Sequence, residues 1–291
     1  MIVLDGTSGI TSPNETITGS LNTPNTFAYK NLLIDAGFTI NQRGYVSAAT
    51  LASGAYGHDR WKAGASGGDY SFTQLASNTQ ITIASGKSLI QVVEDKNVSG
   101  TSYVLSWTGT AQARYAVNSA TPAGSYAASP IVITGQTAGT TMSVEFNTGT
   151  LSKPQLELGA VATSFDQRAY SQELAMCQRY YEKSYDVDTV PATATLASVM
   201  RFPYGAASSI VYANLNFKVP KRTSPTVNTW DQAGNSGRMS FYSGTAGALT
   251  NNLNALASNW GGVSNWGFSA NTSTAGAAGT YTVQWTADAE L

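Results

Sequence analysis

The segment QITIASGKSLIQVVEDKNVSGTSYVLSWTGTAQARYAV, residues 80–117, decides the fold class. Four runs in it have alternating apolar residues or many β-branched residues, at 80–83, 88–94, 102–107 and 113–117. Short turn sequences separate the runs, for example Ser85-Gly86 and Ser99-Gly100. Runs of this length and period, bounded by glycine, are typical of β-strands. Because no helical pattern lies between them, we predict antiparallel sheets, as in a β-sandwich or jelly roll.

The same pattern continues on both sides of this segment. Further strand-like runs precede and follow it, at 32–40, 70–75, 131–134, 141–146 and 153–158. A second group begins after residue 187, at 196–202, 209–219, 226–230, 238–242, 265–270 and 280–285. A chain of 291 residues is long enough for two domains. We therefore predict a mainly β protein with two antiparallel β-sandwich or jelly-roll-like domains, residues 29–168 and 187–291.

One short α-helix is predicted in the linking segment 169–186, AYSQELAMCQRYYEKSYD. Spacings of four, three and four residues place an apolar stripe on one helical face, formed by Tyr170, Leu174, Cys177 and Tyr181. The helix is expected near residues 171–184, with Ser171 as a cap, Glu173 in the first turn and Lys183 in the last. A helix of about 13 residues needs a surface for its stripe. That surface is either a subunit contact of a homo-oligomer or the chain's own sandwich.

Residues 1–28 form a polar stretch rich in Thr, Ser, Asn and Pro. They contain too few large apolar groups to offset the entropy cost of ordering the backbone. We predict an extended N-terminal arm that becomes ordered against a neighbouring protein or a second subunit.

Composition excludes several classes of function. Charged residues make up 11% of the chain and the net charge is −1, so no basic surface for nucleic acid is expected. The single cysteine, Cys177, and the single histidine, His58, cannot form a disulfide or a zinc cluster by themselves. No apolar stretch is long enough to span a membrane, and we expect no signal peptide. We therefore expect synthesis in the cytoplasm without membrane insertion, and no metal or cofactor.

Catalytic motifs are also missing. Gly86-Lys87-Ser88 ends like a phosphate-binding loop, but Ile81 stands where that loop needs glycine. His58 is the only candidate base for a serine hydrolase, and no G-x-S-x-G sequence is present, so we interpret it as an exposed or satisfied loop histidine. A glycosidase needs only two suitably spaced carboxylates, which a sequence cannot exclude. We nevertheless predict no catalytic residue and no enzyme.

The aromatic residues indicate two candidate sugar sites, because aromatic rings stack on sugar faces while polar side chains bind the hydroxyls. The favoured site lies in the second domain and contains Trp230, Asp231, Asn235, Tyr242, Asn259, Trp260 and Trp266. The alternative lies in the first domain and contains Tyr45, Asp59, Arg60 and Trp61. The core is the expected place for Trp61, Trp107 and Trp285, whereas the exposure of Trp260, in NWGG, stays open.

Three stretches resemble bacteriophage tail-fibre and receptor-binding proteins. They are LDGTSGI at 4–10, INQRG at 40–44 with DRW at 59–61, and PQLELG at 154–159 followed by ATSFDQR at 162–168 and the segment 170–184. The tail segments VPKRTSPTV at 219–227 and ADAEL at 287–291 are similar to such proteins too. The resemblance implies a virion tail component with a carbohydrate-binding-module-like jelly roll. It also implies a homotrimer that contacts host surface glycans, with the arm bound to other tail proteins.

Two other functions remain open at this point. The protein could be a structural connector or decoration protein of the tail or capsid without a ligand. It could also be a polysaccharide depolymerase, although it lacks a long central repeat region. Exposed aromatic rings around Trp260 and Trp266 in a concave site would favour glycan binding, whereas burial of all six tryptophans would favour the structural role.

Overall fold

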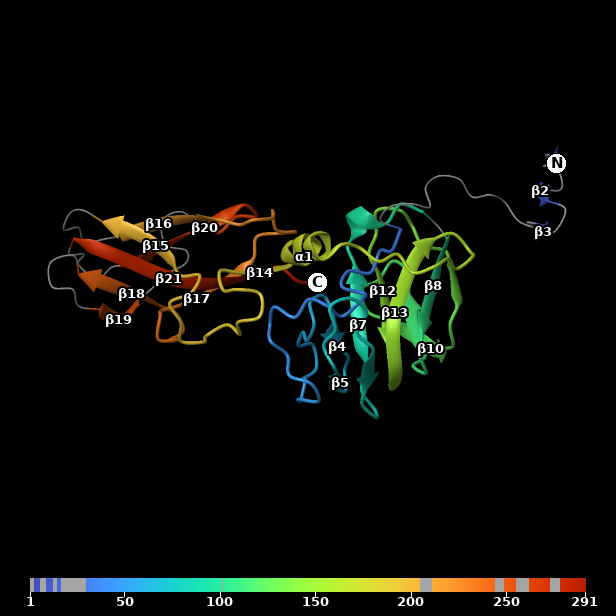
Figure 1. The fold of residues 1–291 in the computed structure, drawn as a ribbon, viewed down its shortest axis with the longest axis horizontal. Helices are drawn as coiled ribbons and strands as arrows, with labels where there is room; N and C mark the ends of the chain where they lie inside the picture. The colour runs from blue at the N-terminus through green and yellow to red at the C-terminus, as the bar shows by residue number, and fades with distance from the viewer. Residues whose placement is uncertain are drawn as a thin grey trace.

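The protein is mainly β, with antiparallel sheets and one α-helix in the part that the computed structural model describes. That part comprises residues 3–5, 9–12, 15–16, 30–100, 102–204, 211–243, 249–254, 262–272 and 278–291. Figure 1 shows two groups of strands with the helix between them, so the predicted fold class is confirmed. No helix of the described residues has the length and apolar character needed to cross a membrane.

The first domain is a sandwich of two five-stranded sheets. One sheet has the order β10-β9-β12-β7-β4, with β4 at Lys62–Ala63, β7 at Leu89–Val93, β9 at Ala113–Ala116, β10 at Ala123–Ala127 and β12 at Met142–Phe146. The other has the order β11-β8-β13-β6-β5, with β5 at Tyr70–Phe72, β6 at Ile81–Ile83, β8 at Ser102–Thr108, β11 at Ile131–Thr134 and β13 at Gly149–Leu158. Most consecutive strands thus lie in opposite sheets, as in a jelly roll, whereas β5 pairs with β6 and β9 pairs with β10 within one sheet.

Side-chain alternation fills the space between these sheets. Along β12, Met142, Val144 and Phe146 enter the core, which also contains both tryptophans of this domain. Trp61 is fully buried and lies 4.9 Å, ring centre to ring centre, from Phe38. The expected burial of Trp61 and Trp107 is confirmed.

The predicted strand at 32–40 is wrong, because this segment forms a series of turns. Asp35 and Phe38 have positive φ angles, of 52° and 49°, which no strand accommodates. The Asp35 carboxylate accepts hydrogen bonds from the backbone N–H groups of Thr39 (2.7 Å) and Ile40 (3.0 Å). Asp35 therefore closes a local turn while the apolar side chains around it still enter the core.

The second domain is organised around one long strand, β21 (Gly279–Asp288), which pairs with four others. Its partners are β14 (Tyr181–Lys183), β15 (Met200–Tyr204), β17 (Thr226–Trp230) and β18 (Arg238–Ser243), and β18 also pairs with β19 (Leu249–Asn254). A separate ladder joins β16 (Val211–Asn216) to β20 (Gly267–Thr272). Tyr281, Val283, Trp285 and Ala287 alternate into the core, so the expected burial of Trp285 is confirmed.

The helix, α1, spans Tyr170–Gln178 and is shorter than predicted. Residues 181–183 instead form β14, so the second sheet begins inside the predicted linking helix. Lys183 was expected in the last helical turn, but its Nζ donates to the carbonyls of Gln42, Val187 and Thr189, at 2.6 to 2.7 Å. The helix begins after Ala169 without a side-chain cap, so the predicted Ser171 cap is wrong.

The apolar stripe of α1 packs on the same chain. Cys177 is fully buried in a cluster with Ile34, Ile40 and Tyr180, and Leu174 packs against that cluster. Tyr181 is buried as well, whereas Tyr170 is 49% exposed. The need for a surface, which motivated the predicted subunit contact at these residues, is thus met within the chain. An oligomer contact at this helix stays a prediction, with Tyr170 as its most accessible member.

The N-terminal arm is described only at three short strands. These are β1 (Val3–Asp5), β2 (Gly9–Ser12) and β3 (Glu15–Thr16), which form an antiparallel sheet in that order. Its ordering against another protein stays a prediction.

Candidate functional site

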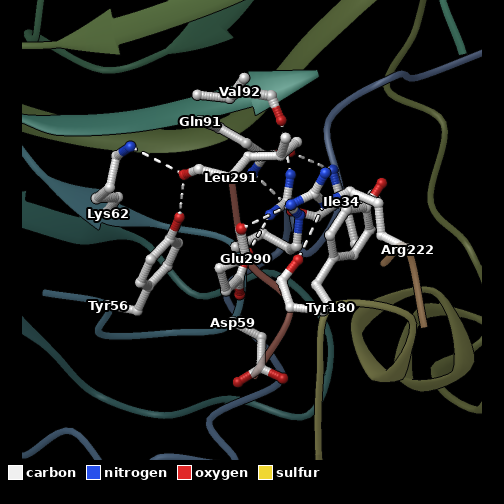
Figure 2. Close-up of polar contacts among 12 residues, drawn as sticks. Ile34, Tyr56, Asp59, Lys62, Gln91, Val92, Tyr180, Arg222, Glu290 and Leu291 are labelled. Atoms are coloured by element: carbon white, nitrogen blue, oxygen red, sulfur yellow. Dashed lines mark hydrogen bonds and ion pairs between the residues drawn. The ribbon is translucent and has the colours of Figure 1, made fainter. Parts of the chain in front are cut away.

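Charged side chains gather at the junction between the two domains (Figure 2). The Glu290 carboxylate, at the C-terminal end of the chain, forms ion pairs with Arg60 and, at 3.3 Å, with Arg43. The main-chain oxygen of Leu291 accepts hydrogen bonds from the Tyr56 hydroxyl (2.6 Å) and from the Nζ of Lys62 (2.9 Å). The last residues of the chain are therefore attached to the first domain.

The cations of this junction are enclosed by aromatic rings and carboxylates. The guanidinium carbon of Arg43 lies 3.7 Å from the ring centre of Tyr181, and that of Arg60 lies 3.6 Å from the ring centre of Tyr180. Such cation–π contacts are strongest where water is excluded. Asp59 is buried between these groups and accepts hydrogen bonds from Gln42 at 2.5 Å and 3.1 Å. Burial raises the pKa of Asp59 to about 6, although the nearby Arg43 favours its charged form.

These contacts correct the alternative sugar site in the first domain. Asp59, Arg60 and Trp61 are buried, so their side chains offer no surface to a sugar. Tyr45 is half-buried, and its hydroxyl donates to the carbonyl of Ala49 at 2.6 Å. The four residues belong to the core and to the domain junction, where the rings bury apolar surface and the buried charges are compensated by ion pairs.

His58 is a satisfied core histidine. Its Nδ1 lies 2.6 Å from the Tyr70 hydroxyl, and its Nε2 lies 3.0 Å from the Oε1 of Gln74. Burial lowers the pKa of His58 to about 4, so the ring is neutral at physiological pH. Both ring nitrogens are thus occupied by structural partners, which agrees with the interpretation of His58 as a satisfied histidine rather than a catalytic base.

The predicted site in the second domain is only partly assembled. Trp230 faces Gln284 and Tyr242 faces Thr280 across the β21 ladder, which places both aromatic residues on one face of the sheet. Four residues of β21 separate those positions, or about 13 Å along the strand at 3.3 Å per residue. Trp266 is 65% exposed but precedes β20 in the other sheet. The described residues therefore do not bring the three rings together.

The polar members of that site have structural roles or lie outside the described residues. The Asp231 carboxylate is buried and accepts hydrogen bonds from the backbone N–H groups of Ala233 and Asn235, each at 2.9 Å. The Asn235 side chain also donates to Asp231, at 2.8 Å, so this pair closes the turn after β17. Asn259 and Trp260 fall outside the described residues.

A pocket of about 170 Å³ lies beside the N-terminal end of α1 in the first domain. Three chain segments and one helical residue line it: 37–39, 76–78, 165–170 and Glu173. Tyr170 contributes a half-exposed ring and Phe165 a half-buried one. Thr39, Ser77, Asn78 and Gln167 add uncharged polar groups. The pocket combines apolar ring faces with hydrogen-bonding groups, which is the composition of a small-ligand site.

The motif PQLELG followed by ATSFDQR builds one wall of this pocket. Glu157 accepts hydrogen bonds from the Gln155 side chain (2.7 Å) and from the Thr163 backbone (2.8 Å). The Oε1 of Gln155 in turn accepts one from the Asp166 backbone N–H, at 2.7 Å. These bonds hold the segment after β13 against that strand. The motif thus fixes the position of Phe165, Asp166 and Gln167.

Arg168 and Glu173 fix the deep end of the pocket. The Nη1 of Arg168 donates to both carboxylate oxygens of Glu173, at 3.1 and 3.2 Å, and to the carbonyl of Leu33. Its Nη2 donates to the carbonyl of Asn31. Glu173 also accepts the backbone N–H of Asp35 at 2.5 Å. Burial, with repulsion from Asp59 and Glu173, raises the pKa of the Asp35 carboxyl well above its usual range.

Two buried atoms of the lining have no hydrogen-bond partner. The amide nitrogen of Asn78 donates to the Gln167 side chain at 3.0 Å, whereas its Oδ1 has no partner, and neither has the Nε of Arg168. A buried polar atom without a partner costs about 1–3 kcal/mol of stability, and both atoms lie beneath the surface. Sequence analysis missed Asn78, Thr39 and Asp166. The FDQR sequence was recognised only as part of a motif, and nothing in 37–39 or 76–78 indicated that these turns meet it.

The described residues contain no group of three or more His, Cys, Asp and Glu side chains placed to hold a metal ion. No known family model matches the sequence, and no curated protein matches it significantly. Two solved structures of discoidin II from Dictyostelium discoideum, one recombinant and one wild-type, were found among similar folds. Each is 11% identical with a TM-score of 0.20, and the matches cover 87% and 89% of this chain and 92% and 91% of the other. A likeness at that TM-score carries no argument about this protein.

Proposed function

We propose that this protein is a non-enzymatic glycan-binding component of a bacteriophage tail, a tail-fibre or receptor-binding protein, and that the pocket beside α1 holds one sugar unit. The observation that carries the proposal is the pocket itself, which is lined by the half-exposed Tyr170 together with the polar residues Thr39, Ser77 and Gln167. A pyranose ring offers both an apolar face for stacking and hydroxyl groups for such polar side chains.

The size of the pocket supports a single sugar unit. Sites for drug-sized ligands span roughly 300–1,000 Å³, and this pocket encloses about 170 Å³. Affinity at one such site is expected to be modest. The tail-fibre assignment rests on the sequence resemblance, and the proposed homotrimer would raise affinity for a glycan-coated surface through multivalent contact. The arm, residues 1–28, would attach each subunit to other tail proteins.

The acidic residues of the pocket favour binding over hydrolysis. A glycosidase needs one carboxyl that donates a proton and a second that acts as base or nucleophile. Glu173 is held in a two-pronged ion pair with Arg168 that occupies both carboxylate oxygens. Neither oxygen is therefore free to reach a glycosidic bond. In the second domain, Trp230 and Tyr242 share one sheet face and stay a proposed secondary contact with glycan.

A bacterial-glycan array probed with the full chain tests this function. We expect wild-type protein to bind a subset of glycans, and Tyr170→Ala to weaken that binding about 2- to 12-fold, because a stacked ring contributes roughly 0.5–1.5 kcal/mol. Trp266→Ala, which removes an exposed ring away from the pocket, is the matched control. Absence of any glycan binding by wild type would favour the structural connector, and reducing ends released from a bound glycan would favour a depolymerase.

Light scattering coupled to size-exclusion chromatography tests the proposed assembly. We expect the mass of a trimer. A monomer at working concentration would contradict the tail-fibre proposal without affecting the pocket.

A further inference from the structure

The charges around the pocket are not balanced for an acidic ligand. Its lining contains two carboxylates, Asp166 and Glu173, and one cation, Arg168. Both terminal nitrogens of Arg168 are already bound to Glu173 and to the carbonyls of Leu33 and Asn31. Its Nε has no partner but is buried, so Arg168 offers no accessible fork of two donors to a ligand carboxylate or phosphate.

Asp166 has no cation of its own among the described residues. The one hydrogen bond to its carboxylate is a long one, 3.4 Å, from the backbone N–H of Asn31 to Oδ2. Its charge thus adds to the negative potential of the lining. An anionic ligand would have to enter against that potential, with its own charge partly removed from water.

Hydrogen bonding at Asp166 has the same preference. Its carboxylate is an acceptor, so it needs a donor from the ligand. A sugar hydroxyl can donate to it, whereas an ionised carboxylate can only accept. The rings of Tyr170 and Phe165 add apolar surface and no positive charge.

We infer that this pocket selects a neutral, hydroxyl-bearing sugar unit and discriminates against sugar acids. This inference rests on the proposed glycan-binding function and adds the chemical class of the ligand. The discrimination arises from Asp166, whose charge and acceptor oxygens disfavour an anion, while the rings bind either class of sugar alike.

The test compares matched sugars that differ only at C6. The probes are methyl glucoside with methyl glucuronide, and methyl galactoside with methyl galacturonide, titrated into the full chain and followed by ligand-observed NMR. We expect at least one neutral member to bind about ten-fold or more tightly than its acid, a difference of about 1.4 kcal/mol. The difference should shrink at high salt, because screening weakens repulsion at a partly exposed site.

Two variants assign the effect to residues. Asp166→Asn keeps the shape of the side chain and should reduce the neutral-to-acid ratio about several-fold, mainly by improved binding of the acid. Trp266→Ala should bind both probes as wild type does.

The outcomes separate this inference from the proposed function. Equal or tighter binding of the acid members, or an unchanged ratio in Asp166→Asn, overturns the neutral-sugar inference while glycan binding stands. If none of the four probes binds, the inference fails, and the array then decides the function. Array binding that Tyr170→Ala abolishes would keep the pocket as a glycan site of another class, and an array without signal would remove the proposed function as well.

Discussion

The domain junction and the pocket beside α1 lie on neighbouring parts of the first domain, yet they use buried charge in opposite ways. At the junction, Glu290 meets Arg43 and Arg60, and the two arginines are covered by tyrosine rings. In the pocket, Asp166 lines the cavity and lacks an ion-pair partner among the described residues. The junction gathers more charges but is closed by the chain itself. A carboxylate without a cation beside a cavity, rather than the number of charges, therefore marks the candidate binding site.

The largest expected effect comes from breaking the junction. Glu290→Ala would leave the buried Arg60 without its carboxylate, and removal of one partner of a buried ion pair costs about 3–5 kcal/mol. The free energy of unfolding, from denaturant titration, measures this loss. Asp288→Asn is the matched control, because Asp288 also pairs with Arg43 but is 41% exposed, and it should cost less than about 1 kcal/mol. Equal effects of the two variants would contradict the closed-junction interpretation.

The next prediction concerns how the free energy of unfolding depends on pH through His58, a buried, hydrogen-bonded residue of the first domain. The unfolded chain binds a proton at His58 near pH 6.5, whereas the folded chain does so only near pH 4. The unfolded state is thus favoured as pH falls through this window, and the contribution saturates below pH 4. His58→Gln lacks this titration. Its stability relative to wild type should therefore rise by about 3 kcal/mol from pH 7 to pH 4, and a pH-independent difference would show that His58 is not buried as a neutral ring.

Truncating one amide side chain at the junction and one in the pocket compares the two regions directly. Gln42 donates to buried Asp59 (2.5 Å) and to the carbonyl of Tyr181 (2.9 Å), so Gln42→Ala leaves buried acceptors without donors. We expect it to cost about 1–3 kcal/mol of stability. Asn78→Ala removes an acceptor that is already unpartnered and should change stability by less than about 1 kcal/mol. Thermal unfolding of both variants checks this, and the reverse order would mean that Asn78 is a structural group.

The smallest expected effect is at Trp266. This ring is 65% exposed, so Trp266→Ala should change the free energy of unfolding by no more than about 0.5 kcal/mol. Tyr170→Ala, at a half-exposed position of the pocket rim, should be similarly mild. Stability therefore does not distinguish the two variants, but glycan binding should. Loss of binding in Trp266→Ala alone would move the site to the second domain.

The sequence by itself determined the mainly β fold and most strand positions. Alternation along 102–107 or 141–146 is a local signal, because each side chain faces the core or the outside according to its place in its own strand. The burial of Trp61, Trp107 and Trp285 follows from the same logic. Local patterns failed where a side chain overrode them, as Asp35 does by closing a turn inside the apolar run 32–40.

Only the tertiary structure decided where α1 ends, what the charges do and where a pocket forms. Residues 181–183 continue the apolar spacing of the helix in the sequence. In the structure they pair with β21 as strand β14, and the pairing of Glu182 and Lys183 with β21 ends the helix early. In the sequence, Asp59 and Arg60 have the composition of a sugar site. In the structure, Glu290, which lies 230 positions after Arg60, binds that arginine. The pocket likewise joins Thr39, Asn78 and Asp166 from three distant turns. Such contacts depend on which segments meet in space, and no local pattern in one sequence encodes that meeting.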